Sequence, residues 1–152
     1  MPEPFNLPGT SPRHGLAYLY PGQAQKEAFV NEALSRIDIL LHARIKGIAA
    51  TPPADPEEGD CWLIAPAATG AWSSHANHLA GWSAGSWVYC APHPGMRVWD
   101  SGAAQQRVFR TSWTAAPAVN PATGGSVVDS QARAAITALI TALKESGVLA
   151  QV

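Results

Sequence analysis

Charged side chains are scarce in this sequence of 152 residues. Asp, Glu, Lys and Arg make up 14% of it, against about 25% in an ordinary soluble domain. A surface so poor in charge is often covered in an assembly, which favours an oligomer. The formal net charge is -1, so the sequence lacks the basic excess of most nucleic-acid-binding proteins. We therefore expect no nucleic-acid partner.

Long apolar runs and a secretory signal are also missing. No stretch approaches the roughly 18 consecutive apolar residues of a membrane span. The N-terminal sequence MPEPFNLPGTSPRHG has no basic region followed by an apolar core. We expect the chain to be made in the bacterial cytoplasm and not to insert into a membrane. In that reducing compartment its two cysteines, Cys61 and Cys90, are expected to be buried thiols rather than a disulfide.

What the sequence does contain is enough apolar material for one core, interrupted by many turn residues. Apolar residues make up 47%, and there are 13 glycines and 13 prolines, so we expect short elements joined by turns. Five of the prolines lie in residues 1–22. This segment is predicted to be an extended arm laid on another surface. Within it, only residues 16–20 are expected to pack or to pair as a strand.

Residues 23–47 are predicted to form a long N-terminal helix. The turn dipeptide Pro21-Gly22 precedes it and Gly47 marks its expected end. Its apolar stripe has helical spacing and consists of Val30, Leu34, Ile37, Leu41 and Ile45.

Residues 48–113 are predicted to form a small antiparallel β-domain. A Pro-rich connector at 48–60 leads into four short β-type runs, CWLIA, GSWVYCA, MRVWD and QRVFRTSW, which are bounded by Gly, Pro, Asn or Ser. The residues Ser83-Ala84-Gly85 suggest a tight hairpin.

A linker at 114–127 and an amphipathic helix at 128–149 complete the predicted α+β organisation. Ser126 and Asp129 have the spacing of a capping box, and Gly147 is expected to end the helix with a Schellman-type contact. An apolar seam with steps of 4, 3 and 4 residues predicts pairing with another helix; it consists of Ala132, Ile136, Leu139 and Leu143. A helix this short is expected to dock on the domain or on symmetry mates.

Several motifs carry a family resemblance, in the order PGQAQKE, NEALSRID, PPADPEEGD, TGAW, GWSAGSWVY and PHPGMRVWD. Together with the C-terminal run GGSVVDSQARAAITALITALKESGVL, they cover roughly residues 20 to 150. The chain resembles a phage-associated domain family of unknown function, which occurs in tail, fibre and spike proteins of tailed phages and in gene transfer agents. A head-spike base protein of a gene transfer agent is the nearest analogy.

The resemblance implies a structural role in a virion and supplies no catalytic residues. The chain departs from the family pattern in two ways: we expect no large receptor-binding or enzymatic domain after the module, and FRTSW replaces an expected Gly-containing turn. A chain that is only the module suggests a base, connector or adaptor. Its expected location is then the phage-like particle, and its expected partners are capsid or tail proteins and a spike or fibre protein.

The six tryptophans, all within residues 62–113, have two interpretations. A small β-domain with few Leu and Ile residues fills its core with bulky aromatics, which we favour for Trp62, Trp87 and Trp99. Flat aromatic faces also suit sugar rings. The polar loop between Trp72 and Trp82 is where a glycan contact is predicted, with four candidate residues: Trp72, His75, His78 and Trp82.

A polar cluster at the start of the first predicted helix comprises Gln23, Gln25, Lys26, Glu27 and Asn31. It is either a solvated helix face or a contact to a neighbouring subunit, since amide side chains both donate and accept hydrogen bonds. The predicted assembly contacts are this cluster and the seam residues Ile136, Leu139 and Leu143. Glu32 and Arg36 can pair at i,i+4.

No arrangement in the sequence indicates catalysis, a metal site or a cofactor. His75 and His78 have a His-x-x-His spacing but no further ligand nearby in sequence. The acidic run at 55–60 lies in a Pro-rich turn, where adjacent carboxylates stay solvated instead of forming an acid–base pair. There is also no nucleophile elbow and no phosphate-binding loop.

Two functions therefore lead, and a small hydrolase is a distant third. The favoured one is a non-enzymatic structural protein of a phage-like particle, forming a closed homo-oligomer that is five-fold on a capsid vertex or three-fold on a tail fibre. The alternative is a carbohydrate-binding module that recognises cell-surface polysaccharide through exposed tryptophans.

Overall fold

The computed structural model describes residues 16–20, 22 and 24–151. Most of the predicted arm at 1–22, and Gln23 of the polar cluster, lie outside the described residues. The elements follow one another as α1 (Lys26–Leu40), β1 (Arg44–Ile45), β2 (Ile48–Ala49), β3 (Cys61–Ile64), a 3-10 turn η1 (Gly70–Trp72), β4 (Leu79–Ser83), β5 (Ser86–Cys90), β6 (Arg97–Asp100), β7 (Gln105–Phe109), β8 (Trp113–Ala115) and α2 (Ser130–Glu145).

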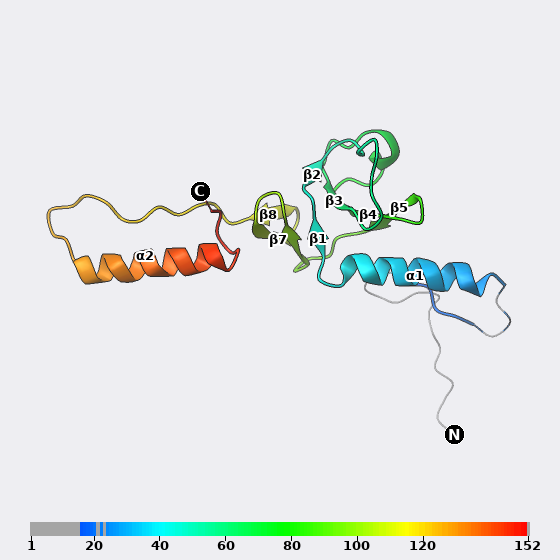
Figure 1. Ribbon diagram of the computed structural model, residues 1–152, viewed down its shortest axis with the longest axis horizontal. Coiled ribbons are helices and arrows are strands. Elements are labelled where there is room, and N and C mark those ends of the chain that lie inside the picture. The colour runs from blue at the N-terminus through cyan, green and yellow to red at the C-terminus, as the bar shows by residue number, and fades with distance from the viewer. Residues whose placement is uncertain (1–15, 21, 23, 152) are drawn as a thin grey trace, which may run out of the picture.

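The strands form two four-stranded sheets, in the orders β1-β6-β7-β8 and β2-β3-β4-β5. The prediction of an α+β protein with a small β-domain is confirmed. The sheets are not purely antiparallel, however, because β1 pairs parallel with β6 and β2 pairs parallel with β3. The chain thus contributes one edge strand to each sheet as it runs through residues 44–49. Figure 1 shows α1 alongside one sheet, and α2 with its linker projecting away from the β-domain.

The first helix is shorter than predicted. It ends at Leu40, and Leu41 has extended backbone dihedrals while its N–H donates to the Ile37 carbonyl. Ile45, expected in the helical stripe, is fully buried in β1. Pairing of residues 44–49 with two different sheets satisfies their backbone groups and buries Ile45, so tertiary structure overrides local helical periodicity here.

The predicted hairpin at Ser83-Ala84-Gly85 is confirmed. Ser83 lies opposite Ser86, so β4 and β5 are joined by a two-residue turn. Both turn residues have positive φ, 52° at Ala84 and 73° at Gly85. This is the conformation of the type I′ turn, whose twist matches that of the flanking strands.

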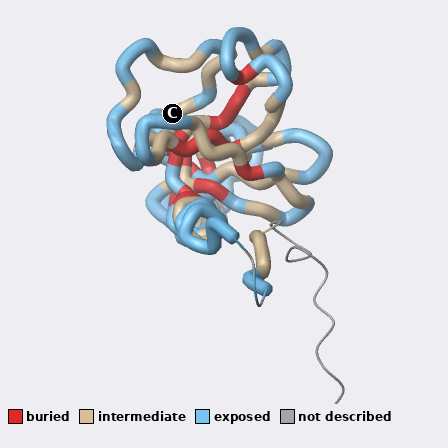
Figure 2. The backbone as a smooth tube through the Cα atoms, turned by 90° about the vertical axis from the view of Figure 1, so that its right-hand side faces the viewer, coloured by how far each residue is buried: buried red, intermediate tan, exposed pale blue. Residues whose placement is uncertain are grey.

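The core lies in the β-domain and has two parts. The first is aliphatic, with Ile45, Leu63 and Leu79 at 0% exposure, and Ile39 of α1 packs against it. The second contains Trp72, Ile64 and Ala80, with Trp62, Trp87 and Tyr89 packed around them. Figure 2 shows the buried segments gathered within the β-domain. Aromatic side chains therefore do fill part of this core, as the composition predicts.

The second helix has a capping interaction at each end. Asp129, not Ser126, is the N-cap, and its carboxylate accepts from the backbone N–H groups of Gln131 and Ala132. At the other end, the N–H groups of Gly147 and Val148 donate to the carbonyls of Lys144 and Leu143. This is the predicted Schellman motif. Gly147 also accepts from the Gln106 N–H at 2.7 Å, which fixes the helix end to β7.

Candidate functional sites

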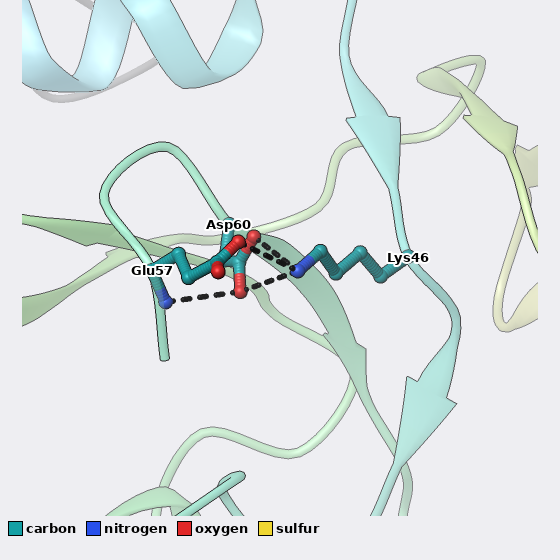
Figure 3. A network of polar contacts seen from close by, with 3 residues as sticks. All are labelled: Lys46, Glu57 and Asp60. Carbon is teal, nitrogen blue, oxygen red and sulfur yellow. Dashed lines mark hydrogen bonds and ion pairs between the residues drawn. The ribbon is translucent and has the colours of Figure 1, made fainter. Parts of the chain in front are cut away.

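The acidic run at 55–60 stabilises the fold. The Asp60 carboxylate lies 2.7 Å from the Lys46 ammonium and accepts the Glu57 N–H at 3.1 Å, while Glu57 lies 3.7 Å from Lys46 (Figure 3). The Glu58 carboxylate accepts from the N–H groups of Ala84 and Gly85 and so caps the β4–β5 turn. These carboxylates are partnered within the fold, and the geometry shows no acid–base pair among them.

This network also fixes the charge states of its members. Burial favours the neutral form of Asp60, but the hydrogen bonds from Lys46 and the Glu57 N–H outweigh it and hold the pKa of Asp60 below its usual value. For Lys46, the hydrogen bond to Asp60 outweighs desolvation and raises the pKa of the ammonium group. Both groups are therefore charged at neutral pH.

The two cysteines are buried free thiols, as predicted. Cys61 lies opposite Gly81 and Cys90 opposite Leu79, on strands that flank β4. Burial, reinforced by the neighbouring Cys90, raises the pKa of Cys61 to about 11. A thiol protonated to that extent is a poor nucleophile.

The predicted glycan residues do not form one platform. Trp72 is 0% exposed and packs edge-on against Trp87, with ring centroids 5.0 Å apart. Trp72 therefore cannot offer a ring face to a ligand, and this prediction is wrong. Trp82 is half-buried and packs against the same Trp87 ring at 5.0 Å.

The two histidines do meet other aromatic side chains. His75 stacks on Tyr89 with centroids 3.6 Å apart and planes at 8°, and His78 lies edge-on to His75 at 5.3 Å. Burial, with His78 nearby, lowers the pKa of His75. Among the described residues, no group of three or more His, Cys, Asp or Glu side chains could hold a metal ion.

A groove of about 600 Å³ lies beside these rings, between β5 and α1. We call it the aromatic groove; the residues that matter below are Arg36, His75, His78, Trp87 and Tyr89. Trp87 and Tyr89 were not predicted as groove residues. The alternation of SWVYC places Trp87 and Tyr89 on one face of β5 and Val88 on the other. All three line the groove, which therefore runs along the outer edge of β5, and the sequence pattern alone does not indicate this.

Helix α1 presents its apolar stripe away from the β-domain. Ile39 packs on the sheet so closely that its side chain fills the space where Gly81 would carry a Cβ. Val30 lies about 180° from Ile39 around the helix. On the outward side, Leu34 is 56%, Ile37 41% and Leu41 67% exposed. The stripe predicted from the sequence therefore exists, but it faces outward instead of forming the core.

The polar cluster adjoins this outward stripe. Gln25 precedes the helix with a positive φ of 55°, and Gln25, Lys26, Glu27 and Asn31 are all exposed. Glu32 and Arg36 form the predicted i,i+4 pair at 2.9 Å.

Helix α2 is even less covered. Ile140, at 8% exposure, is its only buried residue, whereas Ile136, Leu139 and Leu143 are 45%, 64% and 41% exposed. The hydroxyls of Thr137 and Thr141 donate to the carbonyls four residues earlier, at 2.9 and 3.0 Å. These hydroxyl groups are thus hydrogen-bonded within the helix, so a partner could cover α2 on several sides without leaving them unpaired. No helix among the described residues is long and apolar enough to cross a membrane.

The fold and its surfaces define a small α+β protein with two four-stranded sheets and two helices whose apolar faces are exposed. Residues 30–114, more than half of the chain, match the family described as protein of unknown function (DUF2793), and the chain belongs to this family. The match begins inside α1 and ends in β8, so it contains the β-domain up to the last residue of β8 and leaves out α2. No curated protein matches the chain.

Proposed function

We propose that this chain is a non-enzymatic structural protein of a phage-like particle, acting as a base or adaptor for a spike or fibre that adsorbs to the host. The observation that carries the assembly part of this proposal is the exposure of apolar seams on both helices. The particle context comes from the resemblance of the sequence motifs to phage tail, fibre and spike proteins.

The spacing of the α1 stripe favours association of three or more copies. Val30, Leu34 and Ile37 follow steps of 4 and 3 residues, which assigns Leu34 to heptad position a, and Val30 and Ile37 to position d. Leu41, the C-cap residue, follows four residues later at the end of the helix. Leu at a with a β-branched residue at d shifts parallel coiled coils from dimers towards trimers and tetramers. A closed ring of copies is the assembly that a capsid vertex or a tail fibre requires.

The proposal is tested by the mass of the protein in solution. We expect sedimentation of the wild-type chain to give a closed oligomer, and the double substitution Leu34→Gln, Ile37→Gln to give a monomer with unchanged circular dichroism. Val127→Gln is the matched control, because Val127 is 88% exposed but lies outside both helices. A monomeric wild-type chain at tens of micromolar would refute the assembly.

The particle context has its own test. Particles purified from the producing cells are expected to contain the chain at a fixed ratio to the major capsid protein, as measured by quantitative mass spectrometry. Particles that lack the chain would remove the particle role, whatever its oligomeric state.

The aromatic groove supports a second candidate function, a module that binds cell-surface polysaccharide. Trp87, Tyr89 and His75 line an open groove with the charged Arg36 at its rim, and such a mixture of rings and polar groups suits sugars. Glycan binding is expected to quench tryptophan fluorescence, and His75→Ala is expected to weaken the effect. Equal quenching of the wild type and His75→Ala would exclude this groove.

A further inference from the structure

A separate groove of about 600 Å³ lies on the sheet β1-β6-β7-β8, next to the end of α2. We call it the arginine groove. The lining residues used below are Arg97, Val108, Arg110, Ala115, Ala116 and Val148. It belongs neither to the aromatic groove nor to the exposed seams of the helices.

Two of the arginines that line the groove have exposed side chains. Arg97 of β6 lies directly opposite Val108 of β7, so these two side chains lie on the same face of the sheet, and Arg110 directly follows the end of β7 in the turn to β8. Val98, the neighbour of Arg97, points the other way and is 2% exposed in the core. Arg97 and Arg110 therefore reach one groove from β6 and from the β7–β8 turn, and both are exposed.

These two guanidinium groups have no carboxylate partner within the described part of the chain. The ion pairs there use Arg36, Lys46 and Arg107, and the Arg107 guanidinium is held 2.6 Å from the buried Asp100 carboxylate. No acidic residue lines the groove. Two like charges that line one groove without a counter-charge repel each other, and an anionic ligand would relieve this repulsion.

The remaining surface of the groove indicates what the anion is attached to. Val108, Ala115, Ala116 and Val148 supply the aliphatic part of its lining, which we call the aliphatic floor, and the lining contains no aromatic ring on which a sugar could stack. Ala116, the residue after β8, bridges in parallel to Leu149, which covers the edge at that point. The charges and the aliphatic residues of the groove suit recognition of a ligand through its side chains.

We propose that the arginine groove docks an acidic peptide segment of a partner protein. Glutamate carboxylates would accept hydrogen bonds from Arg97 and Arg110, and the methylene groups of the same side chains would lie on the aliphatic floor. Because Val148 is the last residue of the Schellman motif, a docked segment would also contact the base of α2. This interface does not require the helical seams.

The test uses a fluorescein-labelled peptide of eight glutamates, with an octaglutamine peptide for comparison, measured by fluorescence anisotropy on the full chain. We expect the glutamate peptide to bind and the glutamine peptide not to bind. Arg97→Gln and Arg110→Gln are each expected to weaken binding about tenfold, the equivalent of about 1.4 kcal/mol. Arg44→Gln is the matched control, since Arg44 is also exposed but lies outside the groove. Binding should weaken with added salt.

Three results would overturn the proposal. The first is an equal loss of affinity in Arg44→Gln, which would indicate nonspecific attraction. The second is tighter, Arg97-dependent binding of polygalacturonate than of the glutamate peptide, which would assign the groove to an acidic polysaccharide. The third is a fall in oligomer mass in Arg97→Gln or Arg110→Gln, which would make a second copy of this chain the occupant. The oligomer test of α1 is independent of the first two outcomes.

Discussion

The β-domain and the two helices use their apolar residues in opposite ways. In the β-domain, Ile45, Leu63 and Leu79 are completely buried. In the helices, Ile39 and Ile140 are the only buried residues, one in each helix, although both helices carry regular apolar stripes. The β-domain therefore accounts for its own stability, whereas the helices are stabilised fully only when something covers them. The same exposed apolar residues help to explain the low content of charged residues, because they occupy surface positions at which charged side chains are usual.

The largest expected effect is the difference in stability between truncating a buried leucine of the β-domain and truncating an exposed leucine of a helix. Leu63→Ala should lower the free energy of unfolding by about 2–5 kcal/mol, because it leaves a cavity in the core. Leu139→Ala, on the exposed side of α2, should change it by less than about 0.5 kcal/mol. Urea unfolding at a dilution where the chain is monomeric measures both values. Equal losses would mean that α2 packs against the monomer in solution.

The second prediction concerns the junction between the two regions. Gly147 has a φ of 71°, and a Cβ at this position would overlap the Trp99 ring. Gly147→Ala should therefore destabilise the docking of α2 by about 2–4 kcal/mol. Hydrogen exchange of residues 130–145 measures this loss directly.

The matched control for this prediction is Gly124→Ala. Gly124 has a similar φ of 76° but open space around the Cβ position. Gly124→Ala should therefore cost only the smaller free energy of placing alanine at a positive φ. Equal effects of the two substitutions would show that Trp99 does not hold the helix end.

A third and smaller effect tests how α2 begins. Asp129→Ala removes the acceptor for two backbone N–H groups and should destabilise the helix by about 1 kcal/mol. Ser126→Ala should have no effect, although the sequence pattern favours Ser126 as the start of a capping box. Helical content measured by circular dichroism during heating distinguishes the two. A larger effect at Ser126 would contradict the observed N-cap.

The smallest expected effect is the pH dependence of the Lys46–Asp60 pair. The folded state lowers the pKa of Asp60, so the pair stabilises the fold above the unfolded value of about 3.9 and loses this contribution as the pH falls below it. Asp60→Asn should therefore lower the melting temperature at pH 7. It should also make the fall in melting temperature between pH 5 and pH 3 smaller than in the wild type. Asp55→Asn, at an exposed position of the same loop, should leave the pH profile unchanged.

Much of the architecture could be predicted from local chemistry. Turn residues identified the β4–β5 hairpin, and Gly147 identified the Schellman motif that ends α2. These features depend on a few neighbouring residues, whose dihedral preferences are strong. The change from helical to strand periodicity likewise identified the β-domain.

The errors came from interactions that depend on distant residues. The apolar spacing of α1 continues to Ile45, yet the chain leaves the helix at Leu40 because β6 and β3 provide strand partners. The spacing also could not show that Ile39, on the other side, is the residue that packs on Gly81. Trp72 borders a polar loop in the sequence, but it is buried in η1 and packs against Trp87 of β5. A single sequence contains no record of those contacts.

The direction of β1 and β8 has a mechanical consequence. They are the two outer strands of one sheet, and because β6 is parallel to β1 and related to β8 by two antiparallel steps, both run the same way. Tension applied between α1 and α2 would pull β1 and β8 in opposite senses along their lengths. The hydrogen bonds of the sheet would then be loaded together in shear, not broken one by one. We expect single-molecule pulling through the two helices to meet more resistance than pulling across the β4–β5 hairpin.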